Sequence, residues 1–275
     1  MPFTFSHPAA ALPIWPLIRR GIIPLAPFVV GAMTPDVEYL LRLEPLSLVS
    51  HSVRGLFVFC LPVGAVLWAL WEWLVRPVGR DLFALTPSPV SDALSSARDS
   101  SARASGPGWT RTGAWLGVVV ALLLGSASHV GWDAFTHRYA WGGENVPLLR
   151  ETAFTVGGTA VPWYNALQHA STLLGGMVVL GWLWGEVTRG GGALAALWAP
   201  RRLRRWLALG AVALAVGAWN APRRGQMVNP RRLPLVAGRL VVGAMTGFAV
   251  ALVALSVLHR MGRYRLTDPT GTHHA

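Results

Sequence analysis

The chain has 275 residues, of which 53% are hydrophobic and 13% are charged, and its formal net charge is +12. A soluble domain has about 25% charged residues, so this composition excludes a typical soluble globular protein and favours an integral membrane protein. All 24 basic residues are arginines, and they flank apolar segments instead of forming one patch. We therefore expect the arginines to contact lipid headgroups, and we expect no nucleic-acid partner.

The first apolar segment, residues 12–33, is long enough to cross a bilayer but contains Arg19, Arg20 and four prolines. A spanning helix needs roughly 20 mostly apolar residues, because each backbone amide must be bonded within its own segment. Residues 12–33 are therefore predicted to form an interfacial or re-entrant segment.

Five later segments satisfy the length and polarity of a spanning helix. They are residues 56–75, 113–132, 170–184 (extended back to about 164), 206–219 and 239–258. The predicted fold is all-α, a polytopic membrane helix bundle of about five transmembrane helices plus the N-terminal segment. Its predicted parts are a membrane domain with the candidate site at 1–185, including a flexible loop at 86–110, two C-terminal transmembrane helices at 186–260, and a polar tail at 261–275.

Seven histidines and aspartates fall on one side of the membrane when the five spans are drawn. They are His7, Asp36, His51, His129, Asp133, His137 and His169. The spans were assigned from apolar segments alone, so this convergence is independent evidence for one composite site. The arginines divide almost evenly between the two sides, so the positive-inside rule does not decide the orientation.

The densest local pattern is His129, Asp133 and His137, each four residues after the last. This spacing places His129 and Asp133 on one face of a helix. Imidazole nitrogen and carboxylate oxygen bind zinc, and also manganese or iron. The alternative is a hydrogen-bonded core histidine, but ionisable groups at membrane depth are costly and usually functional. The pattern therefore predicts ligands for a divalent metal, with zinc as the first candidate.

The other polar residues each allow two interpretations. Asp36 and His51 are either metal ligands from a second element or, respectively, a turn residue after Pro35 and an interfacial histidine. Arg54 is then a clamp for phosphate or carboxylate. His169 is either a ligand, a residue that supports the ligands, or part of a polar helix contact.

These residues also carry a resemblance. The segment 1–10, Pro35-Asp36, His51-Ser52, Ser128-His129, Trp132-Asp133, Thr136-His137 and Gln168-His169 resemble an uncharacterised bacterial membrane family, domain of unknown function 4184, over at least residues 1–184. The order of the polar residues is also similar to inner-membrane proteins described as LexA-binding, metal-dependent hydrolases. It is more distantly similar to the helical zinc-dependent phospholipase C and nuclease fold. That fold closes with HxxxE, whereas His169 is followed four places on by Leu173, which implies one or two metals instead of three.

The resulting hypothesis is a membrane-embedded, metal-dependent hydrolase of phosphoesters or phospholipid, in which Asp133 and Arg54 contribute to catalysis. The resemblance implies a multi-pass protein of the bacterial inner membrane. The alternative is a non-enzymatic membrane protein, structural or transporting, in which the same residues form a polar His/Asp network. The sequence leaves the substrate and the oligomeric state open.

Overall fold

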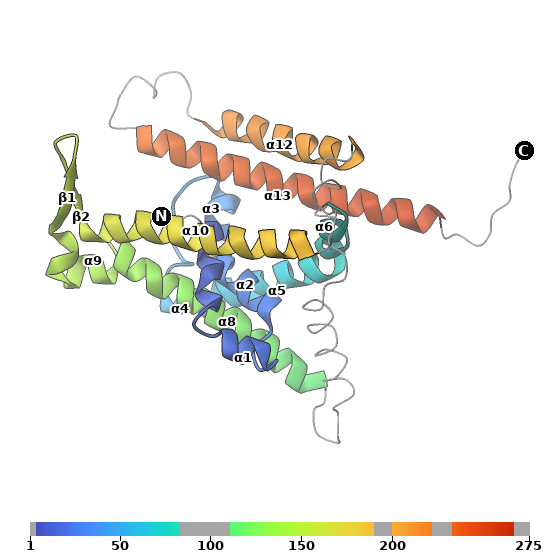
Figure 1. Cartoon of the computed structure of the whole chain (residues 1–275), viewed down its shortest axis with the longest axis horizontal. Coiled ribbons are helices and arrows are strands. Elements are labelled where there is room, and N and C mark those ends of the chain that lie inside the picture. Colours follow the sequence, from blue (N-terminus) through green and yellow to red (C-terminus); the bar gives the residue numbers. More distant parts are fainter. Residues whose placement is uncertain (1–3, 83–110, 190–199, 222–232, 267–275) are drawn as a thin grey trace, which may run out of the picture. The chain divides into compact units, whose positions relative to one another are not determined.

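The structure is a computed structural model that describes residues 4–82, 111–189, 200–221 and 233–266. The described chain is mostly helical, with one two-stranded β-hairpin (Figure 1). Its contacts divide it into two units. Within the described residues, the first unit comprises 4–38, 47–68 and 111–186, and the second comprises 39–46, 69–82, 187–189, 200–221 and 233–266.

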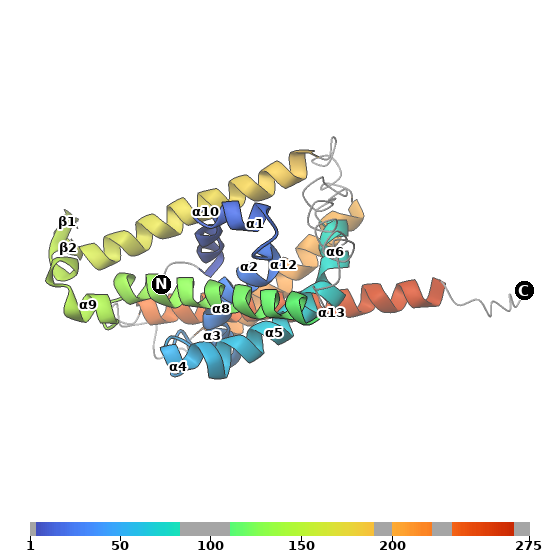
Figure 2. The same cartoon turned by 90° about the horizontal axis from the view of Figure 1, so that it is seen from below.

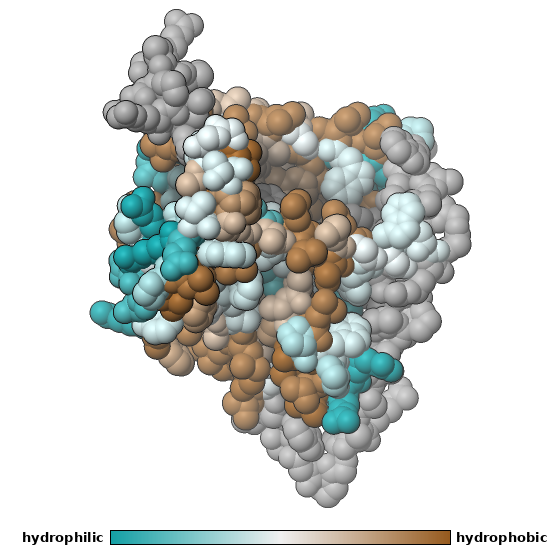
Figure 3. All heavy atoms as spheres, turned by 60° about the vertical axis from the view of Figure 1, so that its left-hand side comes forward, coloured by the Kyte–Doolittle hydropathy of each residue, from teal (hydrophilic) through white to brown (hydrophobic). Residues whose placement is uncertain are grey.

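Four helices in the described part of the chain are long and apolar enough to cross a membrane. They are Val53–Gly79, Trp115–Asn145, Trp163–Gly185 and Leu235–Gly262. Apolar side chains cover much of the face drawn in Figure 3, and large exposed apolar residues such as Leu173, Leu180 and Val250 lie on these helices. Because a protein surrounded by water rarely exposes so much apolar surface, these helices support the prediction of a helical membrane protein.

The predicted number of spans is not confirmed. Four of the five predicted spans coincide with the four candidate helices. The remaining one, residues 206–219, lies in a helix that begins at Pro200. The first turns of this helix contain Arg201, Arg202, Arg204 and Arg205, so its apolar part is shorter than the helix itself. A count of five therefore stays a prediction. The loop predicted at 86–110 and residues 267–275 of the predicted tail lie outside the described residues, and the last helix continues to Leu266.

The first unit is built from short N-terminal segments and two long helices. Its elements are η1 (Thr4–Ala11), α1 (Trp15–Arg19), α2 (Leu25–Met33), η2 (Thr34–Asp36), α8 (Arg111–Thr136), α9 (Trp141–Asn145), η5 (Pro147–Arg150), β1 (Thr152–Val156), β2 (Thr159–Pro162) and α10 (Trp163–Arg189). The short helices α1 and α2 lie between α8 and α10 (Figure 2). Neither is long enough to cross a bilayer at 1.5 Å per residue, and an interfacial or re-entrant placement of residues 12–33 stays a prediction.

A helical run connects the two units. It consists of α4 (Val53–Gly55), η3 (Leu56–Cys60), α5 (Leu61–Leu70), η4 (Trp71–Val75) and α6 (Arg76–Leu82), of which η3 and η4 are π-helical. The side chain of Ser52 accepts a hydrogen bond from the Gly55 amide at 2.9 Å and so begins the run. The loop immediately before it carries His51.

Glycine brings α2 and α8 into backbone contact. A Cβ atom on Gly31 would overlap the carbonyl oxygen of Leu122, and one on Gly125 would overlap that of Phe28. Ser126 adds a hydrogen bond from its hydroxyl to the Gly31 carbonyl at 3.0 Å. The two helices therefore pack more closely than larger side chains allow, and this contact holds the segment after α2 beside the C-terminal half of α8.

The β-hairpin is a feature that the all-α prediction missed. Strands β1 and β2 are antiparallel and joined by Gly157 and Gly158, whose φ angles are 54° and 79°. Two positive φ values in a two-residue loop are typical of a type I′ turn, for which Gly-Gly is a favoured sequence. Two threonine- and valine-rich segments around Gly157-Gly158 were therefore the available signal.

The second unit contains α3 (Val37–Arg42) from its third residue, the end of the helical run, α12 (Pro200–Asn220) and α13 (Leu233–Leu266). Helices α12 and α13 lie side by side (Figure 1). The GxxxG sequence Gly243–Gly247 lies at their contact, where a Cβ on Gly243 would be 2.6 Å from Cβ of Asn220. Asn220 also donates to the carbonyls of Leu43 and Arg239 at 2.8 Å.

We expect Gly243→Ala to destabilise this helix pair by about 1–3 kcal/mol, because the added methyl group forces α12 and α13 apart. The matched control is Gly210→Ala on α12, where a Cβ meets nothing within 4 Å. That variant should be neutral or slightly stabilising, because alanine is the better helix former. Thermal unfolding in detergent measures both, and equal effects of the two substitutions would contradict the packing role of the GxxxG sequence.

Candidate metal centre

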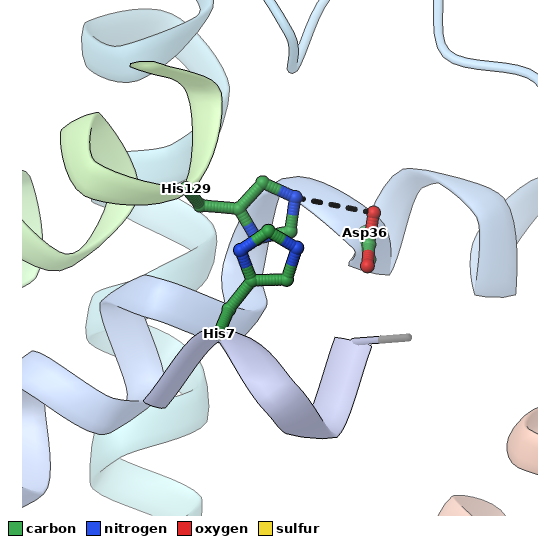
Figure 4. A group of neighbouring side chains, drawn as sticks. All are labelled: His7, Asp36 and His129. Carbon is green, nitrogen blue, oxygen red and sulfur yellow. Dashed lines mark ion pairs between the residues drawn. The ribbon is translucent and has the colours of Figure 1, made fainter. Parts of the chain in front are cut away.

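Five polar side chains from four places in the first unit converge on one buried cluster. His7 comes from η1, Asp36 from η2, His51 from the loop before α4, and His129 and Asp133 from α8. His7, Asp36 and His129 point toward one another in Figure 4. The i, i+4 spacing puts His129 and Asp133 on one face of α8, and the α2–α8 contact brings Asp36 to that face.

Four donor atoms form a closed ring at the centre of the cluster. Nε2 of His129 lies 3.4 Å from Oδ1 of Asp36 and 3.4 Å from Oδ2 of Asp133. Nε2 of His51 lies 3.6 Å and 3.4 Å from the same two oxygens. We call these atoms of Asp36, His51, His129 and Asp133 the four-donor set.

The spacing within the four-donor set fits a metal ion. Two ligand atoms each about 2.1 Å from a tetrahedral metal lie about 3.4 Å apart. The four separations between neighbouring atoms of the set, 3.4 to 3.6 Å, are close to this value and exceed a normal N–H···O hydrogen bond. Two overlapping groups, His7/Asp36/His129 and His51/His129/Asp133, also place one ligand atom per residue within 4.8 Å of one another. The buried His/Asp cluster could therefore hold a metal ion.

Several ligand atoms of the cluster are buried and lack a hydrogen bond. Within the part of the chain that the structure describes, Nε2 of His7, Oδ1 of Asp36, Nε2 of His129 and Oδ1 of Asp133 have no hydrogen-bond partner. An unpaired buried polar atom costs roughly 1–3 kcal/mol, and more when it is charged. The four atoms face one another in two pairs, 3.6 and 3.4 Å apart, and a cation bound between them could satisfy all four.

The opposite nitrogen of His129 fixes how this ring faces the cluster. Its Nδ1 lies 2.7 Å from the carbonyl oxygen of Ala32 on α2. A carbonyl can only accept, so Nδ1 donates, and in a neutral imidazole the lone pair then resides on Nε2. That lone pair faces two carboxylate oxygens, an arrangement that is repulsive unless a cation lies between them or Nε2 carries a proton. Histidine ligands of metals are commonly oriented in this way.

Asp36 is held by Thr4. The Thr4 hydroxyl donates to Oδ2 of Asp36 at 2.5 Å, which leaves Oδ1 facing the histidines. Burial raises the pKa of Asp36, but the adjacent imidazoles of His129 and His51 and the Thr4 hydroxyl outweigh it and hold the pKa well below its ordinary value. Asp36 is therefore a carboxylate, the form that binds metal.

The pKa values of His51 and His7 are shifted in opposite directions. Burial lowers the pKa of His51, but the carboxylates of Asp133 and Asp36 outweigh it and raise the pKa. For His7, burial and the neighbouring His129 lower the pKa to about 4, so this ring is neutral near pH 7. The His7 ring stacks on His129 with centroids 3.5 Å apart, and its Nε2 lies 3.6 Å from Oδ1 of Asp133.

The family model for a domain of unknown function, DUF4184, matches residues 1–257. The chain belongs to this family. The match includes every residue of the cluster and extends through most of α13. Neither a curated protein nor a solved structure matches the chain.

Five of the seven predicted ligands of this DUF4184 protein thus lie together in the cluster, four of them in the four-donor set, and the other two, His137 and His169, lie outside the cluster. His137 lies at the cluster's edge, where its Nδ1 is 3.8 Å from Oδ2 of Asp133 and donates to the Asp133 carbonyl at 3.0 Å. His169 is exposed on α10, and Arg54, the predicted clamp, is exposed on α4. Ligation by any of the seven, and the roles of Asp133 and Arg54 in catalysis, stay predictions.

Three supporting residues of the DUF4184 cluster were missed by the sequence analysis. Thr4 orients Asp36, while Ser50 places its hydroxyl 2.9 Å from Nδ1 of His51. Glu38, which is buried, accepts hydrogen bonds from three backbone amides before His51. Burial raises the pKa of Glu38, but these amide donors outweigh it and lower the pKa to about 2. The available signal for Glu38 was its rarity, since the chain has only 12 acidic residues.

Proposed function

We propose that this protein is a membrane-embedded, metal-dependent hydrolase of phosphoesters, with a divalent metal held by Asp36, His51, His129 and Asp133. The observation that supports it best is the four-donor set, in which the separations between neighbouring atoms, 3.4 to 3.6 Å, are close to those of ligands around one ion. Two oxygens and two imidazole nitrogens suit zinc, with manganese or iron as alternatives.

The charges in the cluster favour a single divalent ion. Histidines bind metal in their neutral form, so the two carboxylates would give the ligands a charge of about −2, which one divalent cation cancels in this buried place. His129 belongs to both candidate ligand groups but has one nitrogen left for metal, because Nδ1 donates to Ala32. A second ion would therefore share ligands with the first and leave excess positive charge. His7 lies next to Oδ1 of Asp133, the oxygen outside the four-donor set. Its imidazole would either hydrogen-bond that oxygen or bind the metal as a fifth ligand.

Hydrolysis needs an accessible side to the centre, and the cluster has one. The side chains of His51 and His137 are 17% and 29% exposed, whereas those of Asp36 and His129 are at most 1% exposed. A substrate would therefore approach past His51 and His137, where the exposed Arg54 would bind a phosphate oxygen. A bound divalent metal supplies Lewis acidity, which lowers the pKa of water toward about 7 and polarises a phosphoryl oxygen.

The rival hypothesis is a non-enzymatic protein whose histidines and aspartates form a hydrogen-bonded network between helices. Such a network satisfies its buried members with one another. The buried atoms of His7, Asp36, His129 and Asp133 face one another at 3.4 to 3.6 Å without a hydrogen bond, and this wide spacing supports a cation site over that network. The lipid environment follows from the apolar helices; residence in a bacterial inner membrane and action on phospholipid belong to the proposal.

The direct test is metal analysis of detergent-purified protein, followed by hydrolysis of p-nitrophenyl and bis-p-nitrophenyl phosphate and of phospholipid in mixed micelles. We expect about one transition-metal ion per chain and hydrolysis that disappears after chelation and returns with added zinc or manganese. Metal without hydrolysis of any of these esters would overturn the phosphoesterase proposal but keep the metal centre. Protein without metal, even after incubation with zinc, manganese and iron, would overturn both.

A further inference from the structure

The carboxylate of Glu38 gathers three consecutive backbone amides. Oε1 accepts from the amide of Leu48 at 3.0 Å, and Oε2 accepts from those of Val49 and Ser50 at 3.1 and 2.8 Å. Glu38 is 3% exposed, so these bonds are shielded from water. Hydrogen bonds to an ionised acceptor are about twice as strong as neutral ones. The carboxylate therefore fixes the turn that ends at His51.

Ser50 transmits this constraint to His51. The Ser50 amide donates a hydrogen bond to Glu38, and the Ser50 hydroxyl lies 2.9 Å from Nδ1 of His51. The Ser50 carbonyl accepts a hydrogen bond from the Cys60 thiol at 3.5 Å. Ser50 is fully buried. With its amide, hydroxyl and carbonyl all engaged, Ser50 has little freedom, and the imidazole of His51 is held with Nε2 toward Asp36 and Asp133.

The predicted ligand Asp36 and the supporting residue Glu38 lie on the same short segment. Asp36 and Glu38 are two residues apart, and their carboxylates act on different parts of the cluster: Asp36 enters the four-donor set, whereas Glu38 holds the loop. Oδ1 of Asp36 and Nε2 of His51 lie 3.6 Å apart. This distance depends on the segment between the two residues, and the hydrogen bonds of Glu38 hold one end of that segment to the other.

We propose that Glu38 is a positioning residue that acts through Ser50 to hold His51 in the metal centre. This inference rests on the proposed metal centre. Groups that orient metal-binding histidines typically change metal affinity 10–100-fold when they are substituted.

The test measures zinc affinity of the full-length protein in detergent by competition with a chromophoric chelator. Glu38→Gln keeps the side-chain size but turns an amide NH₂ toward backbone donors, and we expect affinity to fall about 10–100-fold. The matched control is Glu144→Gln, in the exposed part of α9, which should leave the affinity unchanged. Unchanged affinity in Glu38→Gln would overturn the proposal.

Double-variant cycles separate positioning from a general loss of structure. Ser50→Ala should weaken zinc binding by itself, and adding Glu38→Gln should weaken it little further, because both act on His51. Thr4→Val acts on Asp36 instead, so its fold-change should multiply with that of Glu38→Gln. Fold-changes that multiply in both cycles would show that Glu38 only stabilises the fold, and would overturn the proposal.

A measurement on metal-free protein keeps the inference testable if the proposed function fails. Cleavage after Arg42 and Arg54 yields a peptide, residues 43–54, whose single histidine is His51. The rate at which diethyl pyrocarbonate modifies His51 should rise several-fold in Glu38→Gln and in Ser50→Ala, and stay at the wild-type rate in Glu144→Gln. Wild-type protein without metal would end the proposed function, whereas an unchanged His51 rate in a folded Glu38→Gln variant would end the positioning role.

Discussion

The Asp133→Asn variant is expected to lose its bound metal, from about one ion per chain to below about 0.1. Asp133 faces three histidines of the cluster: Oδ2 lies 3.4 Å from Nε2 of both His51 and His129, and Oδ1 lies 3.6 Å from Nε2 of His7. The substitution keeps the shape but removes one of two negative charges. A divalent ion would then be left with uncompensated charge in a buried site.

Metal content by mass spectrometry and unfolding temperature together check this result. Glu151→Gln, an equal loss of charge at an exposed position, should retain the full metal content. Because a ligand that binds only the folded state stabilises it, chelation should lower the unfolding temperature of wild-type protein but not that of Asp133→Asn. If Asp133→Asn folds and keeps its metal in full, the four-donor set is not the metal site.

Gly31→Ala is expected to destabilise the first unit by about 3 kcal/mol or more and to weaken metal binding at the same time. The added methyl group would overlap the Leu122 carbonyl, which belongs to the backbone of α8 and cannot move like a flexible side chain. Separating α2 from α8 would also lengthen the bond between His129 Nδ1 and Ala32, and would withdraw Asp36. One methyl group on a residue outside the four-donor set should therefore disturb both stability and affinity.

Gly131→Ala is the matched control for that substitution. It lies on α8 between the predicted ligands His129 and Asp133, yet a Cβ there meets nothing within 4 Å. We expect unchanged metal affinity and a slight gain in helix stability. Thermal unfolding and zinc competition should separate the two variants clearly. A Gly31→Ala protein as stable as Gly131→Ala would mean that α2 and α8 are not in backbone contact.

The membrane class and the main helices could be predicted because they depend on local composition. Four of the five predicted spans coincide with candidate spanning helices, and the N-terminal segment forms short helices as its prolines and arginines indicate. The hairpin was missed because the prediction scanned for long apolar segments, and β1 and β2 are only five and four residues long. The fifth span is undecided because arginines occupy the first turns of α12.

For the candidate site, the sequence by itself determined which residue types were available and that His129 and Asp133 share a helix face, since α-helical geometry fixes the direction of residues four apart. Only the tertiary structure decided which histidines meet the aspartates. His129 is bound to a carbonyl 97 residues away, a contact made possible by glycines that let α2 and α8 touch. The tertiary structure also distinguishes His51, which Glu38 and Ser50 hold in the cluster, from His169, which is exposed. Close packing and side-chain support depend on residues distant in sequence, which no local pattern specifies.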